Sequence, residues 1–231
     1  MADLHEIFGL AKRPKLILFD LDGTLVDSAP DLVWCGDEMN RRLGLPCRGL
    51  TAGRSWVGNG IERFVKRALT NDMHGEPESE LFEKGLAIFK ELYAENTSKR
   101  SILYDGVREG LDALSQTEIQ LACVTNKAEQ FTVKVVESLK LKPYFELIVS
   151  GDTTPRKKPD PLPLLFAAEQ YHLDPADCLM VGDSSNDVTA ARAAGFAVVC
   201  VPYGYNHGKD IRSANPDLII NSLEELVRIV E

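Results

Sequence analysis

The chain has 231 residues, of which 44% are hydrophobic and 26% are charged, which is enough for one large globular domain or for a domain with a smaller companion. Its formal net charge of −9 argues against nucleic acid as a general partner, because an acidic surface repels phosphate backbones. The five cysteines are scattered and form no CxxC pair, which argues against a disulfide framework or a zinc site.

Short apolar runs are spread along the chain, and each predicts a buried strand. In chain order they are residues 16–19, 119–124, 147–149, 178–181, 197–201 and 218–220. They are too short for helices and do not alternate with polar residues, which is typical of strands covered on both faces. Amphipathic segments lie between or after them, at 107–114, 131–139, 161–171, 187–194 and 223–230. This alternation predicts an α/β fold with a doubly wound, Rossmann-like parallel sheet.

The stretch from Ser28 to Arg100 interrupts this alternation, since it contains no convincing strand. Residues 31–43, 61–69 and 80–94 carry helical patterns instead. We therefore expect a catalytic core built from residues 1–27 and 101–231, with residues 28–100 inserted as a small α-helical cap domain. Within this cap, the stretch from Trp56 to Gly60 either lines the substrate or forms a tight turn between helices.

Polar residues follow four of the predicted strands at their carboxyl ends, where open α/β sheets bind ligands. These residues are Asp20, Asp22, Gly23 and Thr24 after the first strand, Thr125, Asn126 and Lys127 after the second, Lys158 beyond the third, and Asp183 and Asp187 after the fourth. Clustered carboxylates repel one another unless a cation lies among them, and Mg²⁺ prefers oxygen ligands. The set therefore predicts a small anion bound together with a divalent cation.

The first two acids suit phosphoryl transfer. A carboxylate such as Asp20 can attack phosphorus and form an aspartyl-phosphate. A second carboxyl two residues later, Asp22, can protonate the leaving oxygen and then activate water. The alternative is that both acids only cap a helix or form a turn, as acids after strands often do. Asp20 and Asp183 are the natural metal-binding pair, because each directly follows a strand.

The remaining polar residues suit the binding of a phosphoryl group. Gly23 would let backbone N–H groups approach an anion closely, and Thr24 can add a hydroxyl donor. Thr125 and Asn126 can bind phosphoryl oxygens, and Lys158 can balance developing charge. Thr125 and Asn126 can also cap the helix after their strand, and the two roles are compatible.

Four ordered motifs, FDLDGTLVDS, VTNK, KPDP and GDSSND, resemble those of the haloacid dehalogenase-like phosphohydrolases. The resemblance covers essentially the whole chain, including the cap after the first strand. It implies that Asp20 is the nucleophile and a magnesium ligand, and that Asp22 is the general acid and base and gives its backbone carbonyl to the metal. Asp183 would be a side-chain metal ligand. Asp187 would act through a water or a neighbouring ligand, or only belong to a structural network. The dehalogenases typically lack the second acid, so Asp22 favours phosphoryl transfer.

Three further stretches, DSAPDL, TAGRSWVGNG and VPYGYNHG, resemble the bacterial branch of these enzymes that acts on 2-phosphoglycolate. This implies Mg²⁺-dependent hydrolysis of 2-phosphoglycolate to glycolate and phosphate. One alternative is a related phosphatase or phosphomutase acting on a sugar phosphate, pyrophosphate or a nucleotide. A distant alternative is a phospho-ligand-binding protein without catalysis.

The partner expected from these features is a small phosphorylated metabolite, with the chain acting as a monomer or a small homo-oligomer. No apolar run approaches the length of a membrane span, so no membrane partner is expected. The first fifteen residues lack the apolar core of a secretory signal. The sequence therefore favours a cytoplasmic protein.

Overall fold

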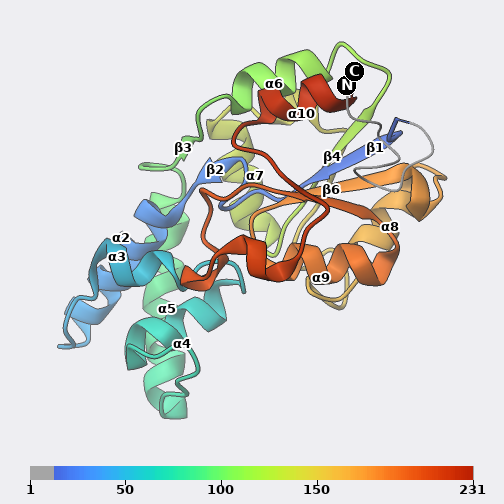
Figure 1. Cartoon of the computed structure of the whole chain (residues 1–231). Coiled ribbons are helices and arrows are strands. Elements are labelled where there is room, and N and C mark those ends of the chain that lie inside the picture. The colour runs from blue at the N-terminus through green and yellow to red at the C-terminus, as the bar shows by residue number, and fades with distance from the viewer. Residues whose placement is uncertain (1–12, 231) are drawn as a thin grey trace.

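The computed structural model describes residues 13–230, and its centre is a six-stranded parallel sheet (Figure 1). The strand order is β5-β4-β1-β6-β7-β8, where the strands are β1 (Leu16–Phe19), β4 (Gln120–Val124), β5 (Leu147–Val149), β6 (Cys178–Gly182), β7 (Ala197–Cys200) and β8 (Leu218–Ile219). The predicted doubly wound α/β fold is therefore confirmed. β1 pairs with β4 on one side and with β6 on the other, so the residues that follow these three strands meet at one edge.

Helices cover both faces of this sheet, as strands that are apolar on both sides require. One face packs against α6 (Val107–Leu114), α7 (Glu129–Ser138) and α10 (Leu223–Val230), and the other against α8 (Leu162–Gln170) and α9 (Ser185–Ala194). Because side chains alternate along a strand, Ile17 and Phe19 of β1 face the first group while Leu16 and Leu18 face the second.

Between β1 and β4 the chain forms helices that lie beside the sheet layer (Figure 1). They are α2 (Ala29–Arg42), α3 (Gly49–Arg54), α4 (Ile61–Thr70) and α5 (Ser79–Asn96). Their apolar side chains share a core in which the rings of Phe64, Phe89 and Tyr93 contact one another in series. Phe131 of α7 contacts Tyr93 and joins this core, so the helical segment packs directly on the sheet layer.

Three short elements are not expected from the sequence. They are α3 and the paired strands β2 (Val26–Asp27) and β3 (Ile102–Leu103), which run antiparallel. The two strands lie where the chain leaves the sheet layer and where it returns. Strands of this length carry no periodic pattern, and their pairing joins residues on either side of the whole inserted segment. Short 3₁₀ helices complete the structure at Lys142–Tyr144, Pro175–Asp177, Asn206–Gly208 and Ile211–Ala214.

The structure also bears on two expectations about the surroundings of the chain. None of the helices within residues 13–230 combines the length and the hydropathy that crossing a membrane requires. The expectation about a secretory signal falls mainly on residues 1–12, which lie outside the described residues. All five cysteines are free, and only Cys47 is exposed.

Candidate active site

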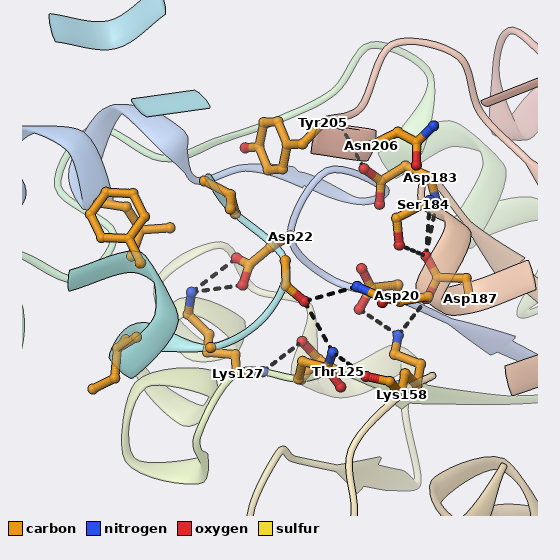
Figure 2. Close-up of a pocket in the computed structure, with 18 residues that line it drawn as sticks. Asp20, Asp22, Thr125, Lys127, Lys158, Asp183, Ser184, Asp187, Tyr205 and Asn206 are labelled. Atoms are coloured by element: carbon orange, nitrogen blue, oxygen red, sulfur yellow. Dashed lines mark hydrogen bonds and ion pairs between the residues drawn. The ribbon is translucent and has the colours of Figure 1, made fainter. Parts of the chain in front are cut away.

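A pocket lies at the carboxyl ends of β1, β4 and β6, where they face α2 and α4 (Figure 2). It brings together seven of the nine residues predicted for the site, which are Asp20, Asp22, Thr125, Asn126, Lys158, Asp183 and Asp187. The helical segment contributes Leu32, Val57, Gly58, Gly60, Ile61 and Phe64 to its wall. Trp56 is instead buried in the core of the helical segment. The stretch from Trp56 to Gly60 thus both anchors a turn and lines the pocket.

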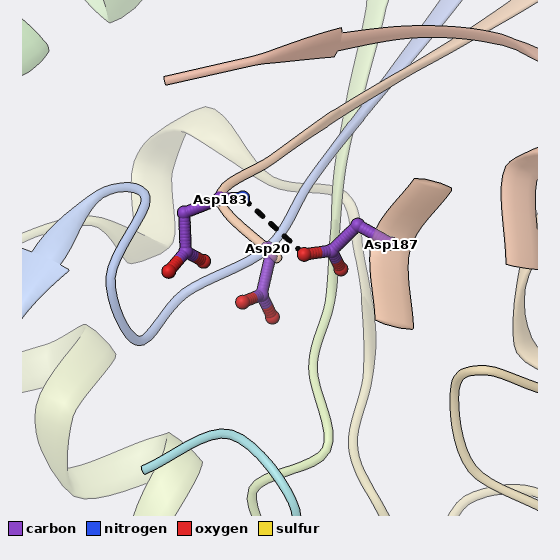
Figure 3. Close-up of side chains that lie close together, drawn as sticks. All are labelled: Asp20, Asp183 and Asp187. Carbon is purple, nitrogen blue, oxygen red and sulfur yellow. Dashed lines mark hydrogen bonds between the residues drawn. The ribbon is translucent and has the colours of Figure 1, made fainter. Parts of the chain in front are cut away.

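Asp20, Asp183 and Asp187 form a compact group of carboxylates (Figure 3). Each offers an oxygen that lies within 4.8 Å of the others, and all three side chains are buried. Together with Asp22, four carboxylates of the pocket face two lysine ammonium groups, which leaves a formal charge of −2. Hard oxygen donors with an uncompensated double negative charge suit a divalent cation. These residues are therefore able to hold a metal ion.

The electrostatics of the group point to the same conclusion. Burial raises the pKa of Asp20 to about 7, with further increases from Asp187 and Asp22, although the nearby Lys158 ammonium acts against them. Burial, followed by the charges of Asp187 and Asp20, also raises the pKa of Asp183 well above its ordinary value. A cation bound between these groups would favour their ionised forms and lower both pKa values.

Asp183 is held in place by contacts from the loop after β1 and the loop after β7. Thr24 Oγ1 donates to Oδ1 over 3.1 Å, and the backbone N–H of Tyr205 donates to Oδ2 over 2.7 Å. Gly23 has a φ of 98°, and a Cβ there would lie only 2.3 Å from Asp183 Oδ2. The N–H of Gly23 donates to the carbonyl of Val26. Gly23 and Thr24 therefore shape the surroundings of Asp183, and their contact with the substrate stays a prediction.

Lys158 connects two of the acids. Its ammonium donates to Asp20 Oδ1 (2.8 Å), to Asp187 Oδ1 (2.7 Å) and to the carbonyl of Val124 (2.6 Å). The second oxygen of Asp187 accepts from the backbone N–H and the hydroxyl of Ser184, which caps α9. Asp187 thus fixes both Lys158 and the start of α9. Within residues 13–230, no hydrogen bond reaches Asp20 Oδ2, so this oxygen is open to a ligand.

Asp22 and Lys127 form a buried ion pair that the sequence analysis did not assign. Lys127 Nζ lies 2.9 Å from both carboxylate oxygens of Asp22, and the exposed fractions of the two side chains are 3% and 12% respectively. The ammonium also lies 5.3 Å from the centre of the Tyr93 ring. Burial lowers the pKa of Lys127, but Asp22 and Tyr93 more than offset it, so the pKa is raised. The sequence signal that could have identified Lys127 is its place in the VTNK motif, directly after Asn126.

Asn126 ties the helical segment to the strand ends. Its side-chain amide donates to the carbonyl of Gly58 over 3.0 Å and to that of Lys158 over 2.9 Å. Both amide hydrogens are thereby used, so the predicted contact of Asn126 with phosphoryl oxygens stays a prediction. Thr125 Oγ1 accepts from the N–H of Lys127, which leaves its own hydroxyl hydrogen for a ligand. The pocket has a cavity volume of ≈ 40 Å³ and is partly open to solvent.

Comparisons with known proteins agree with this geometry. A family model described as haloacid dehalogenase-like hydrolase matches residues 17–201. A phosphoglycolate phosphatase of Nitrosococcus oceani is 55% identical over 221 residues, which cover 96% of this chain and 98% of the relative. A second one, of Thiobacillus denitrificans, is 48% identical over 94% of this chain and 95% of its own. The crystal structure of a predicted phosphoglycolate phosphatase from Haemophilus somnus has a TM-score of 0.88 at 32% identity, covering 96% of this chain and 100% of the other.

Proposed function

Because the chain belongs to the haloacid dehalogenase-like hydrolases, we propose that its pocket hydrolyses a small phosphomonoester, 2-phosphoglycolate, to glycolate and phosphate. The observation that carries this proposal is Asp20, whose Oδ1 accepts from Lys158 while its Oδ2 has no hydrogen-bond partner within residues 13–230. Asp20 also lies beside the carboxylates of Asp183 and Asp187. The names of the relatives at 55% and 48% identity support the choice of substrate. Free, mostly buried thiols fit the expected cytoplasmic setting.

The reaction takes place in two steps. Asp20 Oδ2 attacks phosphorus in line, the bond from phosphorus to the bridging oxygen breaks, and Asp22 gives its proton to that oxygen, so that glycolate leaves. Asp22 then accepts a proton from water as the water attacks the aspartyl-phosphate. The bond from phosphorus to Asp20 breaks, and phosphate leaves with Asp20 restored. Lys158 offsets the negative charge that builds on the phosphoryl oxygens.

Mg²⁺ is the proposed cofactor. The side chains of Asp20 and Asp183 and the backbone carbonyl of Asp22 would hold it. When bound, it supplies positive charge to the phosphoryl group and to the crowded carboxylates. Asp187 would contribute indirectly, by holding Lys158 and the start of α9. Thr125 retains a hydroxyl donor that can reach a phosphoryl oxygen.

Residues 28–100 would act as a cap over a core made of residues 1–27 and 101–231. The helical segment supplies part of the pocket wall, so opening and closing of the cap would control access to Asp20. The hydrogen bond from Asn126 to Gly58 then marks the closed arrangement. Closure would exclude bulk water while the phosphoryl group is transferred.

Phosphate release tests the proposal. The wild-type protein with Mg²⁺ is offered 2-phosphoglycolate, sugar phosphates, pyrophosphate, nucleoside monophosphates and an aryl phosphate. We expect kcat/KM for 2-phosphoglycolate to exceed the others at least about a hundredfold. Asp20→Asn should lose at least about a thousandfold in kcat, because no covalent intermediate can form. The exposed Asp105→Asn is the matched control.

The panel also separates the alternatives. A different preferred substrate would retain the hydrolase and move the assignment to a sugar phosphatase, a pyrophosphatase or a nucleotidase. Conversion of a sugar phosphate to its isomer without phosphate release would identify a phosphomutase. Unchanged turnover in Asp20→Asn would contradict the nucleophile assignment.

A further inference from the structure

We propose that Lys127 binds the carboxylate of the substrate, and that this carboxylate displaces Asp22 from the Lys127 ammonium as the substrate enters. The inference rests on the proposed function and adds the residue that recognises the second anionic group of the substrate. Among the described residues that line the pocket, Lys127 and Lys158 are the cations. Lys158 is saturated by Asp20, Asp187 and a carbonyl, which leaves Lys127 for an anion that is not the phosphoryl group.

The position of Lys127 fits this role. Figure 2 shows the two lysines on opposite sides of Asp20 and Asp22, with Lys127 on the side away from Asp183 and Asp187. The wall contributed by the helical segment is mainly apolar there, through Leu32, Val57, Ile61 and Phe64. Hydroxyls of a sugar would be buried against this wall without partners, which is costly. A short carboxylate would find the ammonium of Lys127.

Covalent geometry places the substrate carboxylate beside this lysine. In 2-phosphoglycolate the carboxyl carbon is two bonds from the bridging oxygen. Asp22 must contact the bridging oxygen in order to protonate it, so the carboxylate necessarily lies close to Asp22. Lys127 Nζ is already 2.9 Å from both oxygens of Asp22. A small change in the lysine side chain is therefore enough to exchange one carboxylate for the other.

The exchange leaves no buried charge unpaired. A buried ammonium without a counter-charge is strongly unfavourable, so Lys127 needs an anion both before and after the substrate binds. Asp22 supplies it in the free protein, and the substrate would supply it in the complex. Asp22 is then released from the ion pair and takes up a proton from solvent, which leaves no unpaired carboxylate. It turns toward the bridging oxygen and gives this proton to it. A neutral leaving group cannot replace Asp22 in this way, and it would react more slowly for that reason.

The backbone around Lys127 is fixed, which confines the exchange to the side chain. Its carbonyl accepts from the N–H of Gly151 over 2.7 Å and from Thr132 Oγ1 over 3.1 Å. Its N–H donates to Thr125 Oγ1 over 3.2 Å. The buried Arg67 is no substitute, because its guanidinium donates to carbonyl and amide oxygens within the helical segment and does not line the pocket.

A change of substrate combined with a change of residue tests the proposal. Wild type, Lys127→Met and Lys127→Arg are each assayed with 2-phosphoglycolate and with ethyl phosphate, which has a methyl group in place of the carboxylate. We expect Lys127→Met to lower the ratio of the two kcat/KM values about a hundredfold, and Lys127→Arg to restore part of that ratio. Lys142→Met makes the same change at an exposed lysine outside the pocket and should leave the ratio unchanged.

The possible outcomes are distinct. If Lys127 only positions Asp22, both substrates lose the same factor and the ratio stays constant, which overturns the proposal. If wild type turns over ethyl phosphate but not 2-phosphoglycolate, the proposed function fails and this inference fails with it.

A structure of Asp20→Asn with Mg²⁺ and 2-phosphoglycolate gives a second answer that does not depend on the folding of a Lys127 variant. We expect a carboxylate oxygen of the ligand within hydrogen-bond distance of Lys127 Nζ, with Asp22 turned away from the lysine. A carboxylate held by other residues, with the ion pair between Asp22 and Lys127 intact, overturns the proposal.

Discussion

Gly23 has no side chain, yet the packing around Asp183 depends on it. Its φ of 98° is unfavourable for other residues, and a Cβ would collide with the Asp183 carboxylate. We expect Gly23→Ala to displace this carboxylate, to weaken Mg²⁺ binding at least about tenfold, and to destabilise the fold by about 1–3 kcal/mol. Calorimetric titration with Mg²⁺ and thermal unfolding measure the two effects.

Gly44→Ala is the matched control for this prediction. Gly44 has a similar φ of 72°, but nothing lies within 4 Å of a Cβ built on it. It should show the backbone cost without the loss of Mg²⁺ affinity. Equal losses of affinity in the two variants would mean that Gly23 does not act through Asp183.

The raised pKa values of Asp20 and Asp183 predict how stability depends on pH when the metal is absent. Both groups hold protons more tightly in the folded state than in the unfolded chain, where Asp titrates near 3.9. Their stabilising effect is complete below about pH 4 and is lost as the pH rises through about 7, the pKa of Asp20. These groups should therefore make the metal-free protein less stable at pH 8 than at pH 5.

Added Mg²⁺ should reverse this loss. The increase in melting temperature on adding Mg²⁺ should be larger at pH 8 than at pH 5, because ionised carboxylates bind the cation and protonated ones do not. Scanning calorimetry of chelator-treated protein at both pH values checks this. A larger increase at pH 5 would contradict the prediction.

At the residue scale, the sequence predicted which side chains lie together in the pocket, but it did not predict the hydrogen-bond and ion-pair partners of each. Seven predicted residues line the pocket because they follow strands whose ends meet at one edge of the sheet. The bond from Thr24 to Asp183 and the ion pair of Asp22 with Lys127 could not be predicted in this way. Each joins positions more than a hundred residues apart, and the choice of partner depends on side-chain geometry.

At the scale of elements, Asp31 of α2 holds the segment through which the chain returns to the sheet layer. Its buried carboxylate accepts from the N–H groups of Arg100 and Ser101 and from the Ser101 hydroxyl. We expect Asp31→Asn to lower the free energy of unfolding by about 2–3 kcal/mol, because an amide accepts fewer and weaker hydrogen bonds. Urea unfolding measures the change.

Asp105→Asn is a suitable control for Asp31→Asn, since Asp105 is exposed and lies just beyond the same segment. It should remain within about 0.5 kcal/mol of wild type. An equally small effect of Asp31→Asn would show that these hydrogen bonds add little net stability.

Elements were predictable where their own residues carried a pattern. The strands of the sheet are continuous apolar runs, and those runs reflect burial on both faces. β2 and β3 carry no such pattern, because each has two residues and gains its structure from the other. The stretch DSAPDL could be recognised in the sequence, but the role of Asp31 depends on residues near position 100 that fold back beside it.

At the scale of the whole molecule, polar contacts join the helical segment to the sheet layer at several points. Asn126 donates to Gly58, and the His207 ring lies 3.2 Å from the carbonyl of Ser55. We expect Asn126→Ala to speed amide hydrogen exchange in residues 56–60 and to lower kcat about tenfold, because the closed arrangement loses a hydrogen bond. Hydrogen-exchange mass spectrometry and phosphate release check the two effects. Unchanged exchange together with a lower kcat would place the role of Asn126 at the substrate instead.

Tyr205 links the Asp183 carboxylate to the start of α2. Its N–H holds Asp183, while its hydroxyl contacts Asp27 and accepts from the N–H groups of Ser28 and Ala29 at the start of α2. A displacement of α2 would thereby be transmitted to the Asp183 carboxylate. If cap closure raises the affinity for Mg²⁺ by some factor, bound Mg²⁺ must favour closure by the same factor, because thermodynamic coupling is reciprocal. We therefore expect closure to be more favourable when Mg²⁺ is bound than when the site is unloaded.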